Sequence, residues 1–255
     1  MLLTIDLGNS NITLGVYQDD NLLFVSRLNT DFYKTTDQYA IELKDILELY
    51  KISPDDVDGS IISSVVPTVL PAITAAIEAL CGVAPIVVGP GVKSGLNIKI
   101  DDPAQLGADM VACGVAALQR YTMPCIMYDL GTATTVSVLG AGGSFLGCAI
   151  LAGMGISLDA LATKTAQLPY VKIEAPTSII GTNSIDSMKS GLVLGTAAMM
   201  DAFTQRIEDE LGQTATVVAT GGLASIVLAH CKRDIIYSDT LLLEGLRIIY
   251  DKNTK

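Results

Sequence analysis

The chain has few of the residues from which zinc sites and disulfide frameworks are built. It contains a single histidine, His230, no tryptophan, and no Cys-x-x-Cys pair. One histidine without paired cysteines cannot complete a zinc site. The cysteines lie far apart in apolar stretches, and we interpret them as small buried residues of a protein in a reducing compartment. They are Cys81, Cys113, Cys125, Cys148 and Cys231.

Basic residues are also scarce. The 255 residues include 16 Lys and Arg against 27 Asp and Glu, which gives a formal net charge of −11 at pH 7. A nucleic-acid partner needs a basic face, so this charge argues against one, whereas nucleotide binding needs only a few local groups and a metal. Charged residues make up 17% of the chain, below the roughly 25% of an average domain, which favours burial of surface against a second copy.

Long hydrophobic runs are missing as well. No apolar stretch approaches the roughly 18 residues of a membrane-spanning helix, and Met1 leads directly into a predicted strand. The sequence therefore predicts no membrane partner, no signal peptide and a cytoplasmic location.

The chain does contain two segments of nearly the same design, Ile5–Thr13 and Tyr128–Val136. In each, an apolar run ends in Asp and is followed by Leu-Gly, small polar residues and a second apolar run. This pattern predicts a strand, a glycine-containing turn and a strand, with the carboxylates of Asp6 and Asp129 at the rim. The alternative is an ordinary Asx turn at each strand end, which the duplication makes the weaker interpretation.

Such turns suit a nucleotide triphosphate. Backbone N–H groups and hydroxyls bind phosphate oxygens, and a carboxylate suits hydrated Mg²⁺. Two facing copies would hold a triphosphate from both sides, which indicates phosphoryl chemistry in a cleft between duplicated halves. The expected phosphate contacts are Gly8, Asn9, Ser10, Gly131, Thr132, Thr134 and Thr135.

The predicted elements repeat in the same order. The first half has strands at 2–6, 12–18, 22–29, 59–66 and 85–88, with a helix at 36–50 that Thr36 would cap and another opened by Pro67 and Pro71. The second half has strands at 124–129, 133–139, 144–150 and 215–219, with helices at 156–167, 184–211 and 239–251. We therefore expect a duplicated α/β fold with a mixed sheet in each half, divided into residues 1–115 and 116–255.

Two further features point to chemistry. Thr220-Gly221-Gly222 lies between an apolar run and a helix, where Gly221 and Gly222 would let an adenine ring or ribose approach the backbone; a plain strand-to-helix turn is the alternative. Asp109 opens a helical stretch at 109–121 and is a candidate general base for a substrate hydroxyl; the alternative is that it only caps the helix.

These landmarks, in this order, resemble the type III pantothenate kinases of the acetate kinase/sugar kinase/Hsp70/actin superfamily. The resemblance spans the whole chain and rests on nine short motifs. They include Asp6-Leu7-Gly8-Asn9-Ser10, Ser63-Ser64-Val65-Val66-Pro67, Gly107-Ala108-Asp109, Asp129-Leu130-Gly131-Thr132, Gly181-Thr182-Asn183-Ser184 and Thr220-Gly221-Gly222. It implies a duplicated, ribonuclease H-like (actin-like ATPase) fold.

The resemblance also implies an activity. Family members are homodimers that transfer the γ-phosphoryl of ATP to the primary hydroxyl of pantothenate, the first step of coenzyme A synthesis, with Mg²⁺ and a monovalent cation, K⁺ or NH₄⁺. By position, Asp6 to Thr13, including Asn11, would hold the triphosphate and Mg²⁺, Asp129 the monovalent cation, and Thr132 the ATP. Asp109 would accept the proton. Ile100, Gly107, Ala108, Met110 and Ser184 would contact pantothenate, Ser184 partly across the dimer interface.

Several positions depart from the family pattern. Met110 stands where the family has Arg, Ile100 aligns with a Tyr, Ser137 replaces an Asp and Ala152 a Pro. The Arg is expected to hold the pantothenate carboxylate, and a thioether cannot replace its charge-assisted hydrogen bonds. The sequence therefore predicts an intact ATP site, and it leaves open two alternatives to pantothenate phosphorylation: a kinase for another small alcohol, or a non-catalytic nucleotide-binding regulator.

Overall fold

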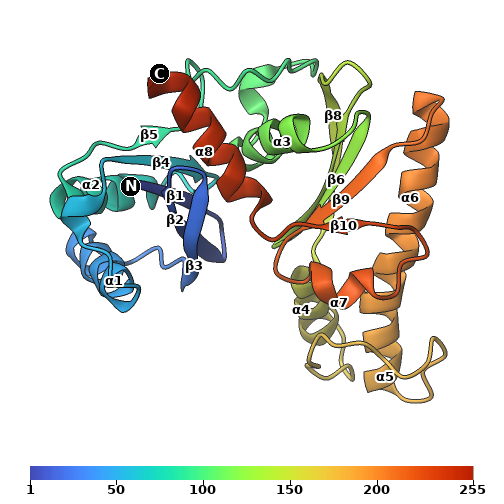
Figure 1. The fold of residues 1–255 in the computed structure, drawn as a ribbon. Coiled ribbons are helices and arrows are strands. Elements are labelled where there is room, and N and C mark those ends of the chain that lie inside the picture. The colour runs from blue at the N-terminus through green and yellow to red at the C-terminus, as the bar shows by residue number, and fades with distance from the viewer. Residues whose placement is uncertain (255) are drawn as a thin grey trace. The chain divides into compact units, whose positions relative to one another are not determined.

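The computed structural model describes residues 1–254, which divide into two compact α/β units (Figure 1). Unit 1 comprises Met1–Leu96, Asp101–Ala116 and the segment that begins at Leu241. Unit 2 comprises Asn97–Ile100 and Ala117–Thr240. Helix α3 (Ala108–Arg120) contains the boundary between Ala116 and Ala117.

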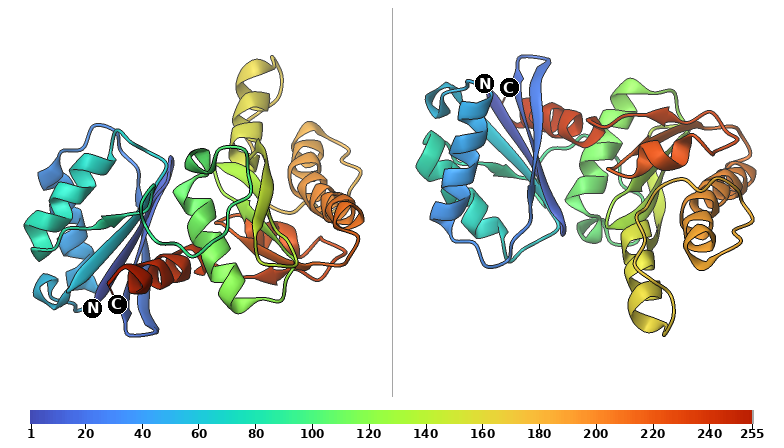
Figure 2. Two further views of the ribbon diagram at one scale, coloured as in Figure 1. Left: turned by 90° about the horizontal axis from the view of Figure 1, so that it is seen from above. Right: turned by 90° about the horizontal axis from the view of Figure 1, so that it is seen from below.

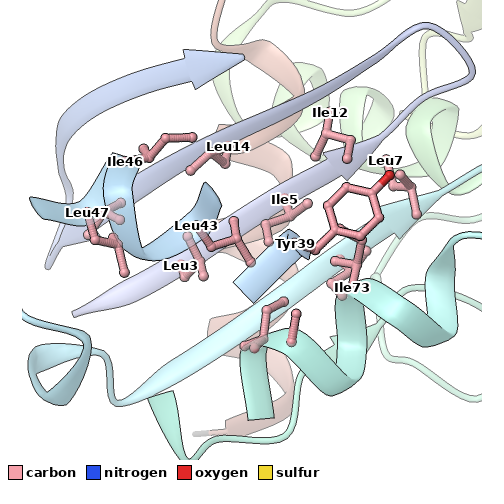
Figure 3. Close-up of a cluster of buried hydrophobic side chains, with 14 of the residues drawn as sticks. Leu3, Ile5, Leu7, Ile12, Leu14, Tyr39, Leu43, Ile46, Leu47 and Ile73 are labelled. Atoms are coloured by element: carbon pink, nitrogen blue, oxygen red, sulfur yellow. The ribbon is translucent and has the colours of Figure 1, made fainter. Parts of the chain in front are cut away.

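Unit 1 is built on a five-stranded mixed sheet with the order β3-β2-β1-β4-β5. Strand β1 pairs antiparallel with β2 and parallel with β4. The bounds are β1 Leu2–Leu7, β2 Asn11–Gln18, β3 Asn21–Asn29, β4 Gly59–Ser64 and β5 Ile86–Val87. Leu3, Ile5 and Leu7 occupy alternate positions of β1, so their side chains lie on one face of the sheet. They pack in one core with residues of α1 (Thr36–Leu49) and α2 (Leu70–Cys81), and Figure 3 shows these side chains together.

The other face of this sheet is covered by the last helix, α8 (Leu241–Thr254). A Cβ on Gly59 of β4 would overlap the Tyr250 ring, and one on Gly15 of β2 would lie 3.0 Å from Cδ1 of Leu243. Both glycines therefore allow α8 to approach the strands closely. Figure 2 shows α1 and α2 on one side of the sheet and α8 on the other.

This packing differs from the domain division expected from the sequence. Contacts divide the chain between Ala116 and Ala117, and they place the terminal helix, which the expected division grouped with residues 116–255, in unit 1. Sequence order places α8 after the second half, whereas its buried residues, such as Leu243 and Leu246, lie against strands from the start of the chain. The pattern of one helix cannot tell which of two similar sheets it covers.

Unit 2 repeats the sheet of unit 1, with the order β10-β9-β6-β7-β8. The bounds are β6 Cys125–Leu130, β7 Ala133–Leu139, β8 Phe145–Ala152, β9 Thr216–Thr220 and β10 Ile236–Tyr237. The helices are α4 Met154–Lys164, α5 Ser184–Lys189, α6 Gly195–Leu211 and α7 Ala224–Leu228, and a π-helical turn, Ser190–Leu194, joins α5 to α6. Strand β6 pairs antiparallel with β7 and parallel with β9, so the predicted duplication of a mixed sheet is confirmed.

Three local predictions need correction. The cap of α1 is Thr35, which forms a capping box with Gln38, and the predicted cap Thr36 is the first helical residue. The predicted helix at 184–211 contains the π-helical turn. Cys148 is exposed, since β8 is an edge strand with an open outer face; Cys113 and Cys125 are buried, and Cys81 and Cys231 are partly buried.

Within residues 1–254, no helix is both long and apolar enough to cross a membrane.

Candidate nucleotide and acceptor site

The β1–β2 turn of unit 1 is braced from the neighbouring strand. The amide of Gly8 donates to the Asn11 carbonyl at 3.0 Å. Thr30, just after β3, donates its hydroxyl to the Gly8 carbonyl at 2.6 Å and its amide to the Ser10 carbonyl at 3.1 Å. The side chains of Asn9, Ser10 and Asn11 are exposed on this fixed turn. The turn therefore presents polar groups to a ligand without needing to fold around it.

Asp6 lies next to this turn in a row of polar side chains. It pairs with Thr13 on β2 and with Ser63 on β4. Because Leu7 and Ile5 point into the α1–α2 core, Asp6 points to the opposite face, and its paired neighbours share that face. Unit 1 thus places a hydroxyl on each side of the Asp6 carboxylate.

Unit 2 has the same arrangement around Asp129. This residue pairs with Thr135 on β7 and with Thr220 on β9. Tyr128 and Leu130 belong to the core beneath α6 and α7, so Asp129 and its two threonine neighbours occupy the other face of the sheet. Each unit therefore carries a hydroxyl–carboxylate–hydroxyl row on corresponding strands.

The two glycine motifs of unit 2 meet at Asp129. Gly221 has φ +97°, and a Cβ there would lie 2.7 Å from Oδ1 of Asp129 and 2.7 Å from the Leu130 nitrogen. A Cβ on Gly131 would lie 3.6 Å from the same Oδ1. The Thr220-Gly221-Gly222 segment therefore lies against the Asp129 carboxylate. The sequence did not reveal this contact, because the two motifs are far apart in the chain.

Gly153 packs closely against the Gly131-Thr132 turn. The Gly131 amide donates to the Ala133 carbonyl at 3.2 Å, and a Cβ on Gly153 would overlap the carbonyls of Gly131 and Thr132. The residues on either side of Gly153 line a pocket of unit 2 with a volume of about 730 Å³. The phosphate turn and this pocket are consequently adjacent within unit 2.

Ser184, the predicted acceptor contact, lines this pocket. The lining combines apolar side chains with hydroxyls and an amide, and no lining residue is ionisable. The polar lining residues are Ser157, Thr182, Asn183, Ser184, Ser187 and Thr196. The pocket can therefore hydrogen-bond hydroxyl and amide groups but offers no cation to a carboxylate.

Asp109 lies in the first turn of α3, in unit 1. Its Oδ1 accepts a hydrogen bond from the Met110 amide at 2.8 Å. A Cβ on Gly107 would overlap this Oδ1. Burial raises the pKa of the Asp109 carboxyl above its ordinary value, against the opposing effect of hydrogen bonds from the Met110 and Asp109 amides. Capping the helix and acting as a base are compatible, since a raised pKa makes the carboxylate a stronger proton acceptor.

The remaining acceptor candidates lie in both units. Gly107, Ala108 and Met110 surround Asp109 in unit 1. Ile100 is in unit 2, directly after Lys99, whose amide donates to the Phe145 carbonyl at 2.8 Å. Ser63 is not among the site residues predicted from the sequence, because only the pairing of β4 with β1 brings it beside Asp6.

The oxygen donors at Asp6 suit Mg²⁺. The row supplies one carboxylate and hydroxyl oxygens, and no cluster of His, Cys, Asp and Glu that could hold a metal exists within residues 1–254. Mg²⁺ usually keeps several waters and binds through one or two carboxylates and substrate phosphates, so a site with few protein ligands fits it.

Known proteins confirm the fold. An activator of 2-hydroxyisocaproyl-CoA dehydratase from Clostridium difficile, solved with bound ADPNP, has a TM-score of 0.57 at 13% identity, over 99% of this chain and 95% of that one. Component A of (R)-2-hydroxyglutaryl-CoA dehydratase from Acidaminococcus fermentans has a TM-score of 0.56 at 16% identity, over 100% and 99% of the two chains. The predicted actin-like fold with two mixed-sheet domains is therefore correct.

Sequence relatives give the family. The sequence model of the type III pantothenate kinases matches residues 2–206. A type III pantothenate kinase from Exiguobacterium is 41% identical over 255 residues, 100% of both chains. One from Roseiflexus strain RS-1 is 42% identical over 253 residues, 99% of both chains. These matches show that the chain belongs to the type III pantothenate kinase family.

Proposed function

We propose that the protein transfers the γ-phosphoryl group of ATP to the primary hydroxyl of pantothenate, the first step of coenzyme A biosynthesis. The observation that carries this proposal is the full-length similarity to type III pantothenate kinases at about 40% identity. The polar row at Asp6 and the half-buried carboxylate of Asp109 are groups that phosphoryl transfer requires.

In the proposed reaction, the residues of unit 1 have separate tasks. The Gly8–Asn11 turn and Thr13 bind the triphosphate, and Asp6 holds the hydrated Mg²⁺ that neutralises phosphate charge. Asp109 accepts the proton of the acceptor hydroxyl as its oxygen bonds to the γ-phosphorus. The bond from that phosphorus to the bridging oxygen breaks, and ADP leaves with the electron pair.

Unit 2 carries a second set of proposed nucleotide contacts. Thr132 and Thr134 contact phosphates, and Gly221 and Gly222 admit the adenine or ribose to the backbone. Asp129 holds a monovalent cation, K⁺ or NH₄⁺, together with oxygens of its row. The close approach of Gly221 to Asp129 supports one continuous site for cation and nucleotide.

The acceptor site includes Ile100 and Ser184, and we propose that it is shared by two copies of the chain. Ser184 belongs to a pocket flanked by exposed apolar side chains: Ile180 is 77% exposed and Ile185 is 46% exposed. Exposed apolar surface of this kind is typical of an interaction site. A homodimer would bury it and bring Ser184 to the acceptor.

Cation dependence tests the role of Asp129. We expect Asp129→Asn to weaken activation by K⁺ about tenfold or more, because losing the carboxylate removes at least ~1.4 kcal/mol of charge attraction. The measurement is initial rate against K⁺ concentration, with choline replacing K⁺. Asp234→Asn, at an exposed carboxylate of the same unit, is the matched control and should leave the curve unchanged. Equal K⁺ activation of Asp129→Asn and the parent protein would contradict the role.

ADP release with MgATP and K⁺, with and without pantothenate, tests the reaction itself. We expect release to depend on pantothenate. A protein that binds ATP but shows no stimulation would overturn the acceptor assignment, and other alcohols would then be screened.

A second candidate function follows from the uncharged pocket and from Met110 beside Asp109: phosphorylation of a different, less acidic alcohol. Met110→Arg separates the two. A pantothenate kinase should keep or improve its KM for pantothenate, because the guanidinium can pair with the carboxylate. A kinase specialised for a neutral alcohol should lose activity with its own substrate.

A further inference from the structure

Strand β4 carries two buried hydroxyls that have no hydrogen-bond partner. The Oγ atoms of Ser60 and Ser63 are both enclosed and unbonded, and the side chains are 1% and 0% exposed. Buried polar groups are nearly always paired in native proteins, so each unpaired hydroxyl calls for an explanation.

The two serines point to opposite faces of the sheet. Ser60 pairs with Leu3, whose side chain lies in the core with α1 and α2. Ser63 pairs with Asp6, and its neighbour Ile62 lies in that core, so Ser63 points to the face of Asp6 and Thr13. Only Ser63 therefore faces the proposed nucleotide site.

We propose that Ser63 is a positioning residue for Asp6. Its hydroxyl donates to the Asp6 carboxylate once the nucleotide and its cation are bound, and it fixes the direction in which the carboxylate meets the hydrated cation. The inference rests on the proposed function, which places Mg²⁺ at Asp6. Paired positions of neighbouring strands bring the two side chains side by side on one face, so a side-chain rotation is enough to form the bond.

The duplicated half gives independent support. The residue that occupies the corresponding position beside Asp129 is Thr220 on β9, which is also buried, at 6% exposure. Both halves therefore keep a hydroxyl at this place although their sequences around it differ. A purely structural position on this face would accept an apolar residue, and Ile61 and Val218 occupy the same face two pairs earlier on these strands.

Equilibrium binding to the ligand-free protein tests this role. We expect Ser63→Ala to weaken binding of ATP in the presence of Mg²⁺ by about tenfold, the effect of one hydrogen bond to a charged group. Binding of ATP in EDTA should change by less than about twofold, because the hydroxyl acts through the cation-binding carboxylate. Titration calorimetry of each variant with ATP, with and without Mg²⁺, gives both values, and melting temperatures report the fold.

Two variants control the experiment. Ser60→Ala removes the other unpaired hydroxyl of β4 from the core face and should bind MgATP like the parent protein. Ser63→Thr restores the hydroxyl, copies Thr220 and should recover most of the affinity. Equal MgATP binding by Ser63→Ala and the parent, or equal weakening by Ser60→Ala, would overturn the inference. Failure of the parent protein to bind MgATP would instead overturn the proposed function.

Discussion

Replacing Asp109 with Asn is expected to lower kcat by a factor of about 10² to 10⁴, the usual contribution of a general base. Asn keeps the size of the side chain and can still accept the hydrogen bond from the Met110 amide, but it cannot take up a proton at neutral pH. ATP affinity should stay nearly unchanged. Rapid-quench measurement of product formation, together with calorimetric titration of ATP, separates the two quantities.

Asp102→Asn is the matched control. Asp102 also accepts a backbone hydrogen bond at the start of a short helix, from the Ala104 amide at 3.1 Å, and is exposed. The Asp102→Asn variant loses one negative charge, as Asp109→Asn does, but it should retain the kcat of the parent protein. Normal turnover in Asp109→Asn would refute the assignment of the base.

The raised pKa of Asp109 adds a stability effect to the same variant. Burial favours the protonated carboxyl in the folded state, so the folded protein holds this proton more tightly than the unfolded chain. The favourable contribution is complete below the unfolded pKa of about 3.9 and is lost as pH rises through the folded pKa. Asn avoids this loss, so Asp109→Asn should melt at a higher temperature than the parent at neutral pH, with the difference shrinking in acid.

Gly221→Ala is expected to cost roughly 2–5 kcal/mol of folding free energy and to abolish cation activation. The residue has φ +97°, which L side chains rarely adopt. The added methyl would also lie 2.7 Å from Oδ1 of Asp129 and from backbone atoms of Leu130. Either the Thr220–Gly221 segment or the Asp129 carboxylate must move to remove this overlap. The substitution should therefore lower the stability of the fold and disturb the proposed cation site together.

Thermal melting and the K⁺ dependence of ADP release measure both effects. A loss of this size should lower the melting temperature by roughly 5–15 °C in a protein of this length. Gly155→Ala is the control, since Gly155 lies in α4 with nothing within 4 Å of the new Cβ, and it should be neutral or slightly stabilising. A Gly221→Ala protein with normal melting and normal K⁺ activation would show that the close approach has no functional importance.

The local patterns predicted the strands well, and contacts between distant segments account for most of what they missed. The β7 strand at 133–139 was predicted with its observed bounds, because alternation and the flanking glycines are encoded in adjacent residues. The two-residue strand β10 was not, since Ile236–Tyr237 has too few residues for a pattern and forms only by pairing with β9. The π-helical turn likewise leaves no mark in the apolar spacing of 184–211.

The candidate site divides in the same way. Asp6, Asp129 and the glycine turns could be recognised, because each motif occupies a few consecutive residues. The rows Thr13–Asp6–Ser63 and Thr135–Asp129–Thr220 could not, because each depends on the register of three strands. The contact of Gly221 with Asp129 also joins segments that are remote in the sequence.

The position of α8 has a consequence for how the chain folds as it is synthesised. The strands of unit 1 are made early, but the face on which Gly59 meets Tyr250 stays open until the last helix leaves the ribosome. All of unit 2 lies in the sequence between Leu96 and Leu241, two residues of unit 1, so the segments of unit 2 are available before unit 1 can close. A nascent chain that stops before Leu241 exposes apolar strand surface, and the helper proteins that bind such surfaces would be needed over this interval.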